Sequence, residues 1–382
     1  MDKKRLEPIV HNKKDLQKYF YEVMKKGEYL YVDDGIAFSC DFFDLLEKIK
    51  EELKSYFAKM NYKFTYVFDN NQVDVLLKKA DHNKYCYFKI CNQYLNSKTF
   101  SFEGIVKHET EYLAKGEIFS IMDVVEKFSN EVLCIPLLSG KDLYKEKYRW
   151  YVSLPNGEMQ QIGELLYEYD ETHNVKFFIN FSLIISMMLM NSDEKGLVLP
   201  TKISPIDIVV IPKNKAKPGT IELCEKITNQ LKKFNILLDD SEDTFGYKNA
   251  YYDLKGIPFK IIASMGEGKE HITVCSRFNQ EKQEIALEEL ESFIDVKKIK
   301  MSRQMLKINR IYIDKQTILT KDNLLNDEYV NIVPWCGEKC FEMNSEMDYL
   351  IPFHQMLSSV PCHFCGKLNK KFIYIFKKSQ NF

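Results

Sequence analysis

The chain has 382 residues and carries 54 lysine and arginine residues against 55 aspartate and glutamate residues, for a net charge of −1. This balance excludes a generic polyanion binder but permits local basic patches. The length allows two or three domains. No apolar segment follows the charged N-terminus, and the most apolar run, Phe177–Met190, is too short to cross a bilayer. Ten cysteines, mostly scattered singly, suit a reducing compartment. We therefore expect a cytoplasmic protein without a membrane partner.

The first half of the chain predicts one long helix and several strands. Apolar side chains recur at helical spacing from Asp41 to Met60, which indicates an amphipathic helix. Strand-like runs follow at Tyr62–Phe68, Tyr85–Ile90, Val132–Leu138 and Tyr148–Leu154. The turn at Pro155-Asn156-Gly157 closes a hairpin toward Gln160–Gly163. These elements predict a mixed, mainly antiparallel sheet with helices.

After Gly196 the pattern changes to alternating strands and helices. The predicted strands are Ile206–Ile211, Asn235–Leu238, Phe259–Ala263 and Ile272–Arg277. The predicted helices include Thr220–Phe234 and a closing helix at Ala286–Val296. Such alternation predicts a compact α/β domain. From about Met301 the chain becomes basic and then rich in cysteine, which indicates a third unit.

Two close cysteine pairs near the C-terminus form a metal-binding pattern. Cys336 and Cys340 make the first pair, and Cys362 and Cys365 make the second. Each pair can turn two thiolates onto one tetrahedral ion, so the spacing predicts a structural Zn²⁺ site. The alternative is four free cysteines in the core. Four thiolates fill the coordination shell, so such an ion stabilises the fold and leaves no position for catalysis.

The second and third units resemble the C-terminal part of the prolyl-tRNA synthetases of archaeal and eukaryotic type. Gly196–Val210 (GLVLPTKISPIDIVV) resembles the junction between the catalytic and anticodon-binding domains of that family. Gly246–Ile261 (GYKNAYYDLKGIPFKI) is similar to the family block GWKFNEWELKGVPLRI. The tail WCGEKC…PCHFCGK resembles the zinc-bearing C-terminal domain of the family.

The resemblance implies an RNA-facing surface on the second unit. It assigns RNA contacts to six residues: Lys248, Tyr251, Asp253, Lys255, Arg277 and Arg303. Tyr251 replaces a family glutamate, and carboxylates of this block read guanine edges in the family. Arg303 belongs to a basic helical face with Lys307 and Arg310, for which a solvated surface is the alternative interpretation.

The first half resembles a class II synthetase core whose catalytic motifs are degenerate. Val106-Lys107-His108-Glu109 stands where motif 2 of the family reads Phe-Arg-x-Glu, so Lys107 replaces a forked arginine with a point charge. Ser182 stands in place of the motif 3 arginine that stacks on adenine. The family loop that holds the proline ammonium has no counterpart between Val75 and Phe102. No catalytic residue is therefore assigned beyond the degenerate positions Lys107, Glu109 and Ser182, and ATP is not expected as a cofactor.

Together these features predict three domains of α/β and α+β class. Residues 1–195 would form a degenerate class II core with an antiparallel sheet, 196–300 an α/β anticodon-binding-like domain, and 301–382 a small zinc-bearing α+β domain. The predicted function is that of a prolyl-tRNA synthetase paralogue without normal proline activation, whose status as an enzyme stays open. It would act through tRNA, as a homodimer formed through the helix Asp41–Met60, or with another protein, and not through DNA. The alternatives are a repurposed ligase that activates another acid, and a purely structural dimerising subunit.

Overall fold

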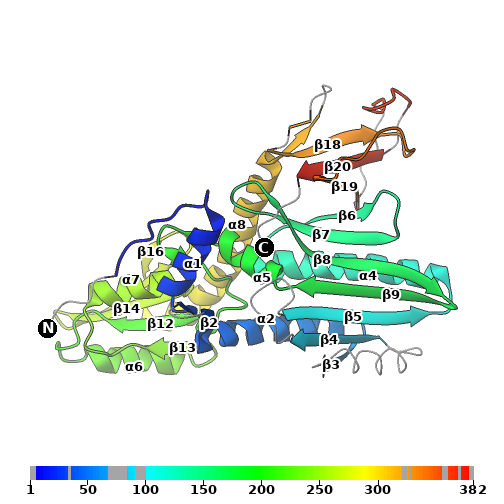
Figure 1. Cartoon of the computed structure of the whole chain (residues 1–382). Helices are drawn as coiled ribbons and strands as arrows, with labels where there is room; N and C mark the ends of the chain where they lie inside the picture. The colour runs from blue at the N-terminus through cyan, green and yellow to red at the C-terminus, as the bar shows by residue number, and fades with distance from the viewer. Residues whose placement is uncertain are drawn as a thin grey trace. The chain divides into compact units, whose positions relative to one another are not determined.

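The computed structural model describes residues 6–32, 36–67, 84–90, 100–320, 325–326, 328–354, 360–368 and 371–377 (Figure 1). The chain forms two compact units. The first comprises residues 1–52, 131–134 and 188–307, and the second comprises residues 53–130, 135–187 and 308–382. The mixture of helices with two large sheets confirms the predicted mixed class. The finer division into domains 1–195, 196–300 and 301–382 stays a prediction.

The first unit is built on a five-stranded sheet. Its strands are β12 (Ile208–Pro212), β13 (Ile236–Leu238), β14 (Phe259–Gly266), β15 (Lys269–Ser276) and β16 (Lys282–Glu284), in the order β13-β12-β14-β15-β16. β12 lies parallel to β13 and β14, whereas β15 and β16 continue the sheet in antiparallel pairing. The predicted strands of this region are confirmed to within a few residues.

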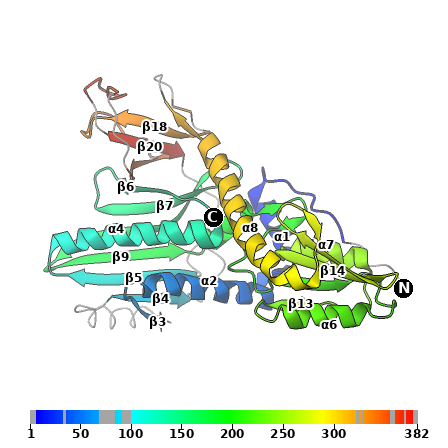
Figure 2. The ribbon, with the colours of Figure 1, turned by 180° about the vertical axis from the view of Figure 1, so that it is seen from behind.

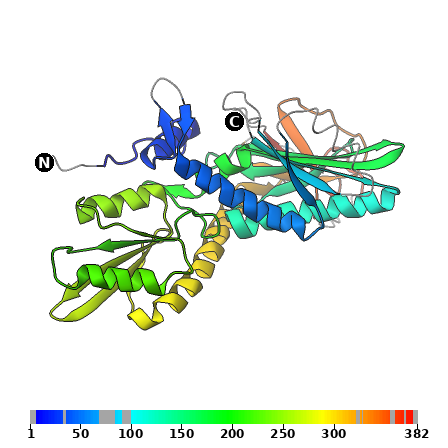
Figure 3. The ribbon, with the colours of Figure 1, turned by 90° about the horizontal axis from the view of Figure 1, so that it is seen from below.

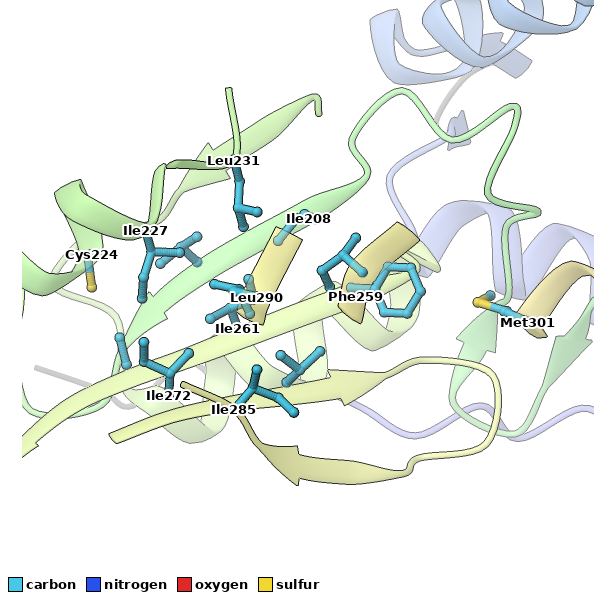
Figure 4. Close-up of a cluster of buried hydrophobic side chains, with 14 of the residues drawn as sticks. Ile208, Cys224, Ile227, Leu231, Phe259, Ile261, Ile272, Ile285, Leu290 and Met301 are labelled. Atoms are coloured by element: carbon cyan, nitrogen blue, oxygen red, sulfur yellow. The ribbon is translucent and has the colours of Figure 1, made fainter. Parts of the chain in front are cut away.

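Helices cover both faces of this sheet (Figure 3). They are α6 (Thr220–Gln230), α7 (Phe245–Lys255) and α8 (Leu290–Lys315). Along β12, Ile208 and Val210 point into a core with α6 and α8 residues, shown in Figure 4, while Val209 and Ile211 pack with α7. The predicted end of the closing helix at Val296 is wrong. Met301 and Met305 extend its buried stripe by further turns, so the helix continues.

The N-terminal segment belongs to this first unit. It contains α1 (Leu16–Lys26), β1 (Leu30–Val32), β2 (Ile36–Phe38) and the beginning of α2 (Cys40–Ala58). Asp15 starts α1 by accepting a hydrogen bond from the backbone N–H of Lys18, and α1 packs against α7 and β11 (Gly196–Leu197). β11 pairs with β10 (Ser192–Asp193). None of α1, β1 and β2 was predicted from the sequence.

Two glycines fix the contact between β11 and the end of α7. Gly256 ends α7 in the left-handed conformation, with φ of +76°. A Cβ atom at Gly256 would lie 2.7 Å from the backbone of Leu197, and one at Gly196 would lie 2.5 Å from Leu254. Both positions therefore require glycine for close approach as well as for backbone conformation.

The second unit is built on an eleven-stranded sheet in the order β17-β18-β20-β19-β6-β7-β8-β9-β5-β4-β3. In chain order the strands are β3 (Lys63–Val67), β4 (Tyr85–Ile90), β5 (Phe100–His108), β6 (Leu138–Asp142), β7 (Lys147–Ser153), β8 (Met159–Asp170), β9 (Thr172–Asn180), β17 (Thr317–Leu319), β18 (Val330–Trp335), β19 (Met347–Pro352) and β20 (Lys371–Lys377). All pairs are antiparallel except β3 with β4 and β17 with β18. β19 joins β6, with Leu350 opposite Asp142, so the C-terminal strands extend the same sheet.

The long helix α4 (Glu111–Phe128) packs along β5, β8 and β9 (Figure 2). Thr110 caps it by accepting a hydrogen bond from the N–H of Leu113. The π-helical turn η1 (Ser129–Leu133) follows, and α5 (Ser182–Met190) comes after β9. The strand predicted at Val132–Leu138 is therefore wrong, because a short buried apolar run does not distinguish a strand from a buried turn.

The predicted helix at Asp41–Met60 is confirmed as α2. Its apolar side chains Phe42, Leu45, Ile49, Leu53 and Phe57 are all buried within the chain. The apolar face on which the predicted dimer rested is thus occupied by the chain's own packing. Across the described part of the chain, no helix combines the length and apolarity that a membrane span requires.

Candidate functional site

The residues predicted to contact RNA are held largely by internal interactions of the first unit. Arg277 is fully buried (0% exposed) and donates from Nε to the carbonyl of Asp253 at 2.8 Å. Its two terminal nitrogens lie 2.8 and 2.5 Å from the carboxylate of Asp193. This bidentate ion pair orders β10 against the end of β15, so the guanidinium is not presented at the surface.

Lys248 and Asp253 are also buried. The Lys248 Nζ atom donates to the carbonyls of Asp239 and Ser241 and lies 3.1 Å from the Asp239 carboxylate. Asp253 pairs with Lys260 at 2.7 Å. These contacts fix the turn before α7 and the start of β14. Both side chains therefore serve the internal packing of the domain in this conformation.

Tyr251 and Lys255 lie nearer the surface, where two acidic residues of the N-terminal segment meet them. The Tyr251 hydroxyl donates to Glu28 at 2.5 Å, and Lys255 pairs with Asp41 at 2.5 Å. Burial and the Glu28 contact raise the pKa of Tyr251, so this side chain stays a neutral donor. Glu28 and Asp41 lie more than 200 residues away in the sequence and were not predicted as partners.

Arg303 is the one predicted RNA residue that is exposed. It lies on α8 with Lys307 one turn further on, and Arg310 is exposed as well. Among the six predicted residues, Arg303 is therefore the one best placed to meet a phosphate without prior rearrangement.

The four predicted zinc ligands come together in the second unit. The Sγ atoms of Cys336, Cys340, Cys362 and Cys365 all lie within 4.8 Å of one another. Neighbouring sulfurs are 3.5 to 3.7 Å apart. A tetrahedral ion with Zn–S bonds of about 2.3 Å requires sulfurs about 3.8 Å apart, so this set fits one such ion.

Glycines shape both cysteine turns of this cluster. Gly337 and Gly366 follow Cys336 and Cys365 directly, with φ of +90° and +71°. The N–H of Gly366 donates to the carbonyl of Cys362 at 2.9 Å. Each pair of thiols is thus presented by a tight turn, as a four-sulfur structural site needs.

The sheet of the second unit presents one face of half-buried polar side chains. Strand alternation places Glu103 and Lys107 of β5 on this face, opposite the buried Phe102 and Val106. Neighbouring strands add Lys176 and Glu164, which pair with Glu168 and Lys147 respectively. The charges of this face are thus largely engaged with one another.

Lys107 and His108 of the motif 2 position are the last two residues of β5. His108 Nε2 lies 3.7 Å from Glu117, a carboxylate 6% exposed that accepts hydrogen bonds from Tyr62 at 2.8 Å and Lys84 at 2.6 Å. Burial lowers the pKa of His108 despite this carboxylate, so His108 is uncharged at neutral pH. Glu109 follows in the exposed turn before α4. Sequence reasoning missed Tyr62, Lys84 and Glu117, because no motif links them.

The motif 3 position carries no charge. Ser182 is the first residue of α5 and is buried, and its hydroxyl has no hydrogen-bond partner in the described part of the chain. Arg149 is the only arginine between Arg5 and Arg277. Its guanidinium lies on β7 between two carboxylates, 2.9 Å from Asp142 and 3.0 Å from Asp348.

Comparison with known proteins finds two kinds of similarity. The family profile of the anticodon binding domain matches residues 207–297. The chain is 26% identical over 336 residues to a proline–tRNA ligase of Ruminiclostridium cellulolyticum, which covers 77% of this chain and 70% of that protein. Similar matches are a proline–tRNA ligase of Clostridium botulinum (26%) and proline–tRNA ligase 2 of Bacillus cereus (24%). The chain is thus similar to proline–tRNA ligases over about three quarters of its length.

The range that matches the anticodon binding domain contains five of the six predicted RNA residues. Arg303 alone lies beyond the matched range. The motif positions Lys107, Glu109 and Ser182 lie outside that range as well. Their assignment, like that of the RNA contacts, stays a prediction.

Proposed function

We propose that this synthetase-like protein does not activate proline and acts in the cytoplasm by binding tRNA or as a partner subunit. The observation that supports the absence of proline activation is the set of ion pairs made by Arg149. It is the sole arginine of the sequence between Arg5 and Arg277, and two carboxylates hold its guanidinium. Adenylate formation needs cations on the developing phosphate charge.

The other candidate cations of the catalytic half support the same proposal. Lys107 offers a point charge in place of a forked donor, His108 is neutral at pH 7, and Ser182 is uncharged and buried. Loss of one such donor typically slows a reaction by about 10²–10³-fold. The segment where the family has its proline-binding loop, between Val75 and Phe102, lies largely outside the described residues.

The decisive experiment is ATP–pyrophosphate exchange with proline. We expect no signal above a control without enzyme. A proline-dependent signal well above that control would refute the proposal. The assay is repeated with a panel of amino and carboxylic acids, since activity with one of them would establish the repurposed ligase instead.

The proposal that the protein binds tRNA rests on Arg303 and Lys307, two exposed cations one turn apart on α8. We expect micromolar binding of tRNA that weakens as salt rises. The double change Arg303→Gln and Lys307→Gln should reduce the slope of log affinity against log salt by about 2. Lys232→Gln, at another exposed lysine of the same unit, is the matched control and should leave the slope unchanged.

Filter binding with a proline tRNA and an unrelated tRNA measures both affinity and selectivity. If neither RNA is retained at low salt, the proposal of tRNA binding is wrong and the proposed function as a partner subunit remains. Light scattering tests the homodimer. The homodimer through α2 stays a prediction, and a monomer at micromolar concentration would refute it.

The metal of the four-cysteine cluster is proposed to be Zn²⁺ with a structural role. The sulfur spacing of 3.5 to 3.7 Å and the all-thiolate donor set support this choice. Cys336, Cys340, Cys362 and Cys365 would hold the ion. Metal analysis of protein purified without chelator would identify it.

A further inference from the structure

The outer face of α4 carries exposed aromatic side chains. The helix buries its other side on the sheet, through residues such as Ile118 and Val125 (Figure 2). On the outer side, Tyr112 is 85% exposed and Phe119 is 55% exposed. Phe353 supports the Phe119 ring, with the ring centroids 5.2 Å apart. Single exposed apolar side chains are ordinary, but two aromatic rings two turns apart on one helix face form a common apolar surface.

Gly116 lies between these two aromatic residues, within the helix. A glycine inside a helix lowers helix stability relative to alanine. Its backbone is helical, and a Cβ atom added there would meet no other atom within 4 Å in the described part of the chain. The packing of the single chain therefore does not require glycine at this position. A second helix that crosses this face does favour a small residue, because the side chains at the contact set how closely two helices approach.

Two rows of side chains run along this face at a spacing of four residues. The first row consists of five exposed residues: Glu111, Lys115, Phe119, Asp123 and Lys127. The second row contains the small residues Gly116 and Ser120. The Ser120 hydroxyl donates to the carbonyl of Gly116 at 3.0 Å, so it lies against its own helix. A ridge of larger side chains thus borders a shallow groove, which is the arrangement by which two helices pack.

The charges of the first row are complementary to those of its own reverse. Lys115 lies four residues before Phe119, and Asp123 lies four residues after it. A two-fold axis near Phe119 would bring Lys115 of each copy beside Asp123 of the other, twice in one contact. Within the single chain, Lys115 pairs with Glu111 at 2.6 Å, and Asp123 lies 3.9 Å from His354. Both side chains are more than half exposed, so both are accessible to a partner.

From these observations we propose that the outer face of α4 binds a second copy of this chain, with the two α4 helices antiparallel and crossing near Phe119. Phe119 of each copy would pack over the small residues Gly116 and Ser120 of the other, and the pairs of Lys115 with Asp123 would flank this contact. No residue of α2 or α8 takes part. A contact of one helix from each copy lies at the small end of interface sizes, so the association should be weak, with a Kd of about 1–100 µM.

Sedimentation equilibrium of the full chain, from about 1 to 200 µM, measures this association. We expect a reversible equilibrium between monomer and dimer. Gly116→Gln places a long side chain in the groove and should weaken the dimer by at least about tenfold. The same change should leave Tm unchanged or raise it, because glutamine is the better helix former. Gly246→Gln, at a helical glycine of α7 that also has open space around it, is the matched control and should leave the Kd unchanged.

Charge reversals test the antiparallel register. Lys115→Asp alone would set aspartate against Asp123 at both ends of the contact, and Asp123→Lys alone would set lysine against Lys115. Each variant should therefore dimerise at least about tenfold more weakly than the native chain. An equimolar mixture of the two variants has opposite charges at both ends, so it should associate within about threefold of the native Kd.

The remaining outcomes overturn the proposal. A chain that stays monomeric up to about 200 µM lacks this contact. A dimer whose Kd is unchanged in Gly116→Gln forms elsewhere, for example through the predicted α2 surface. A mixture that associates no better than its two components contradicts the antiparallel register. If Gly116→Gln does not fold, the mixing experiment still decides the question. The assays of proline activation and tRNA binding are independent of all these results.

Discussion

The ion pair between Arg277 and Asp193 provides the sharpest test of the structure. The Arg277 guanidinium is fully buried, whereas the Asp193 side chain is 32% exposed. Asp193→Asn keeps the size of the side chain but removes the charge that balances the guanidinium. The variant should therefore leave a buried cation whose nearest remaining carboxylate, Asp253, lies 3.9 Å away and is already paired with Lys260.

The magnitude follows from the burial of the two partners. Removing one member of a buried ion pair costs about 3–5 kcal/mol of stability. Because Asp193 is partly exposed and asparagine can still accept one hydrogen bond, we expect a loss near the lower end, about 3 kcal/mol. For a unit of this size, each kcal/mol lowers Tm by about 2–4 °C, so Tm should fall by about 6–12 °C.

The pH dependence of this loss has a definite sign. Burial alone would raise the pKa of Asp193, but the hydrogen bonds and charge of Arg277 outweigh it and hold the pKa below its usual value. The pair therefore stabilises the fold fully above the unfolded pKa of about 3.9, and this stabilisation is lost as pH falls through the lower folded value. The Tm difference between the native chain and Asp193→Asn should shrink below about pH 4.

Thermal unfolding followed by circular dichroism measures these differences. Asp240→Asn, in the exposed acidic turn of the same unit, is the matched control and should shift Tm by no more than about 1 °C. A Tm for Asp193→Asn equal to that of the control would refute the buried ion pair. Arg277 would then be available at the surface, and its predicted role in RNA contact would gain support.

Three other predictions follow from the packing. Gly256→Ala should lower the free energy of unfolding by about 2–4 kcal/mol. Gly268 has nearly the same φ (+78°) but open space around it, so Gly268→Ala should lower the free energy of unfolding by only about 1 kcal/mol. Equal losses for the two variants in urea unfolding would contradict the close contact between Gly256 and Leu197. Cys362→Ser should reduce bound zinc from about one equivalent to below about a tenth and destabilise mainly the second unit, measured by metal analysis and limited proteolysis. Glu117→Gln should cost about 1–3 kcal/mol in urea unfolding, because the Lys84 ammonium loses its charged partner, and an unchanged midpoint would refute that role.

The sequence predicted the local elements of the first unit well because each follows a simple pattern. β12 and β14 are short apolar runs bounded by turn residues, and α6 carries apolar residues at helical spacing. The helix α4 was missed, although Thr110 and Glu111 are a recognisable start, because Gly116 and several β-branched residues weaken its helical propensity. Tertiary packing of Ile118, Ile121 and Val125 overrides that weakness.

The candidate sites also differ in how far the sequence could predict them. The four-cysteine cluster could be predicted because ligand spacing within each pair is a local property. The partners of the proposed RNA residues could not, since Glu28 lies 223 residues from Tyr251 and Asp41 lies 214 residues from Lys255. No periodicity connects positions so far apart. The placement of the N-terminal segment beside α7 therefore needed the structure.

Arg149 and Arg277 are held in a similar way. They are the only arginines between Arg5 and Arg303, and each is held by carboxylates of the chain itself. A forked guanidinium serves phosphate and carboxylate equally well, so one that is already bound on both sides is unavailable to a nucleotide. Releasing either arginine would also leave its carboxylates without their cation, as Asp142 partly is already. The contacts of Arg149 thus support the proposal that the chain does not activate proline. We also predict that restoring single arginines at Lys107 or Ser182 does not restore activity, because the family's pocket glycines and proline-binding loop have no counterpart in the sequence either.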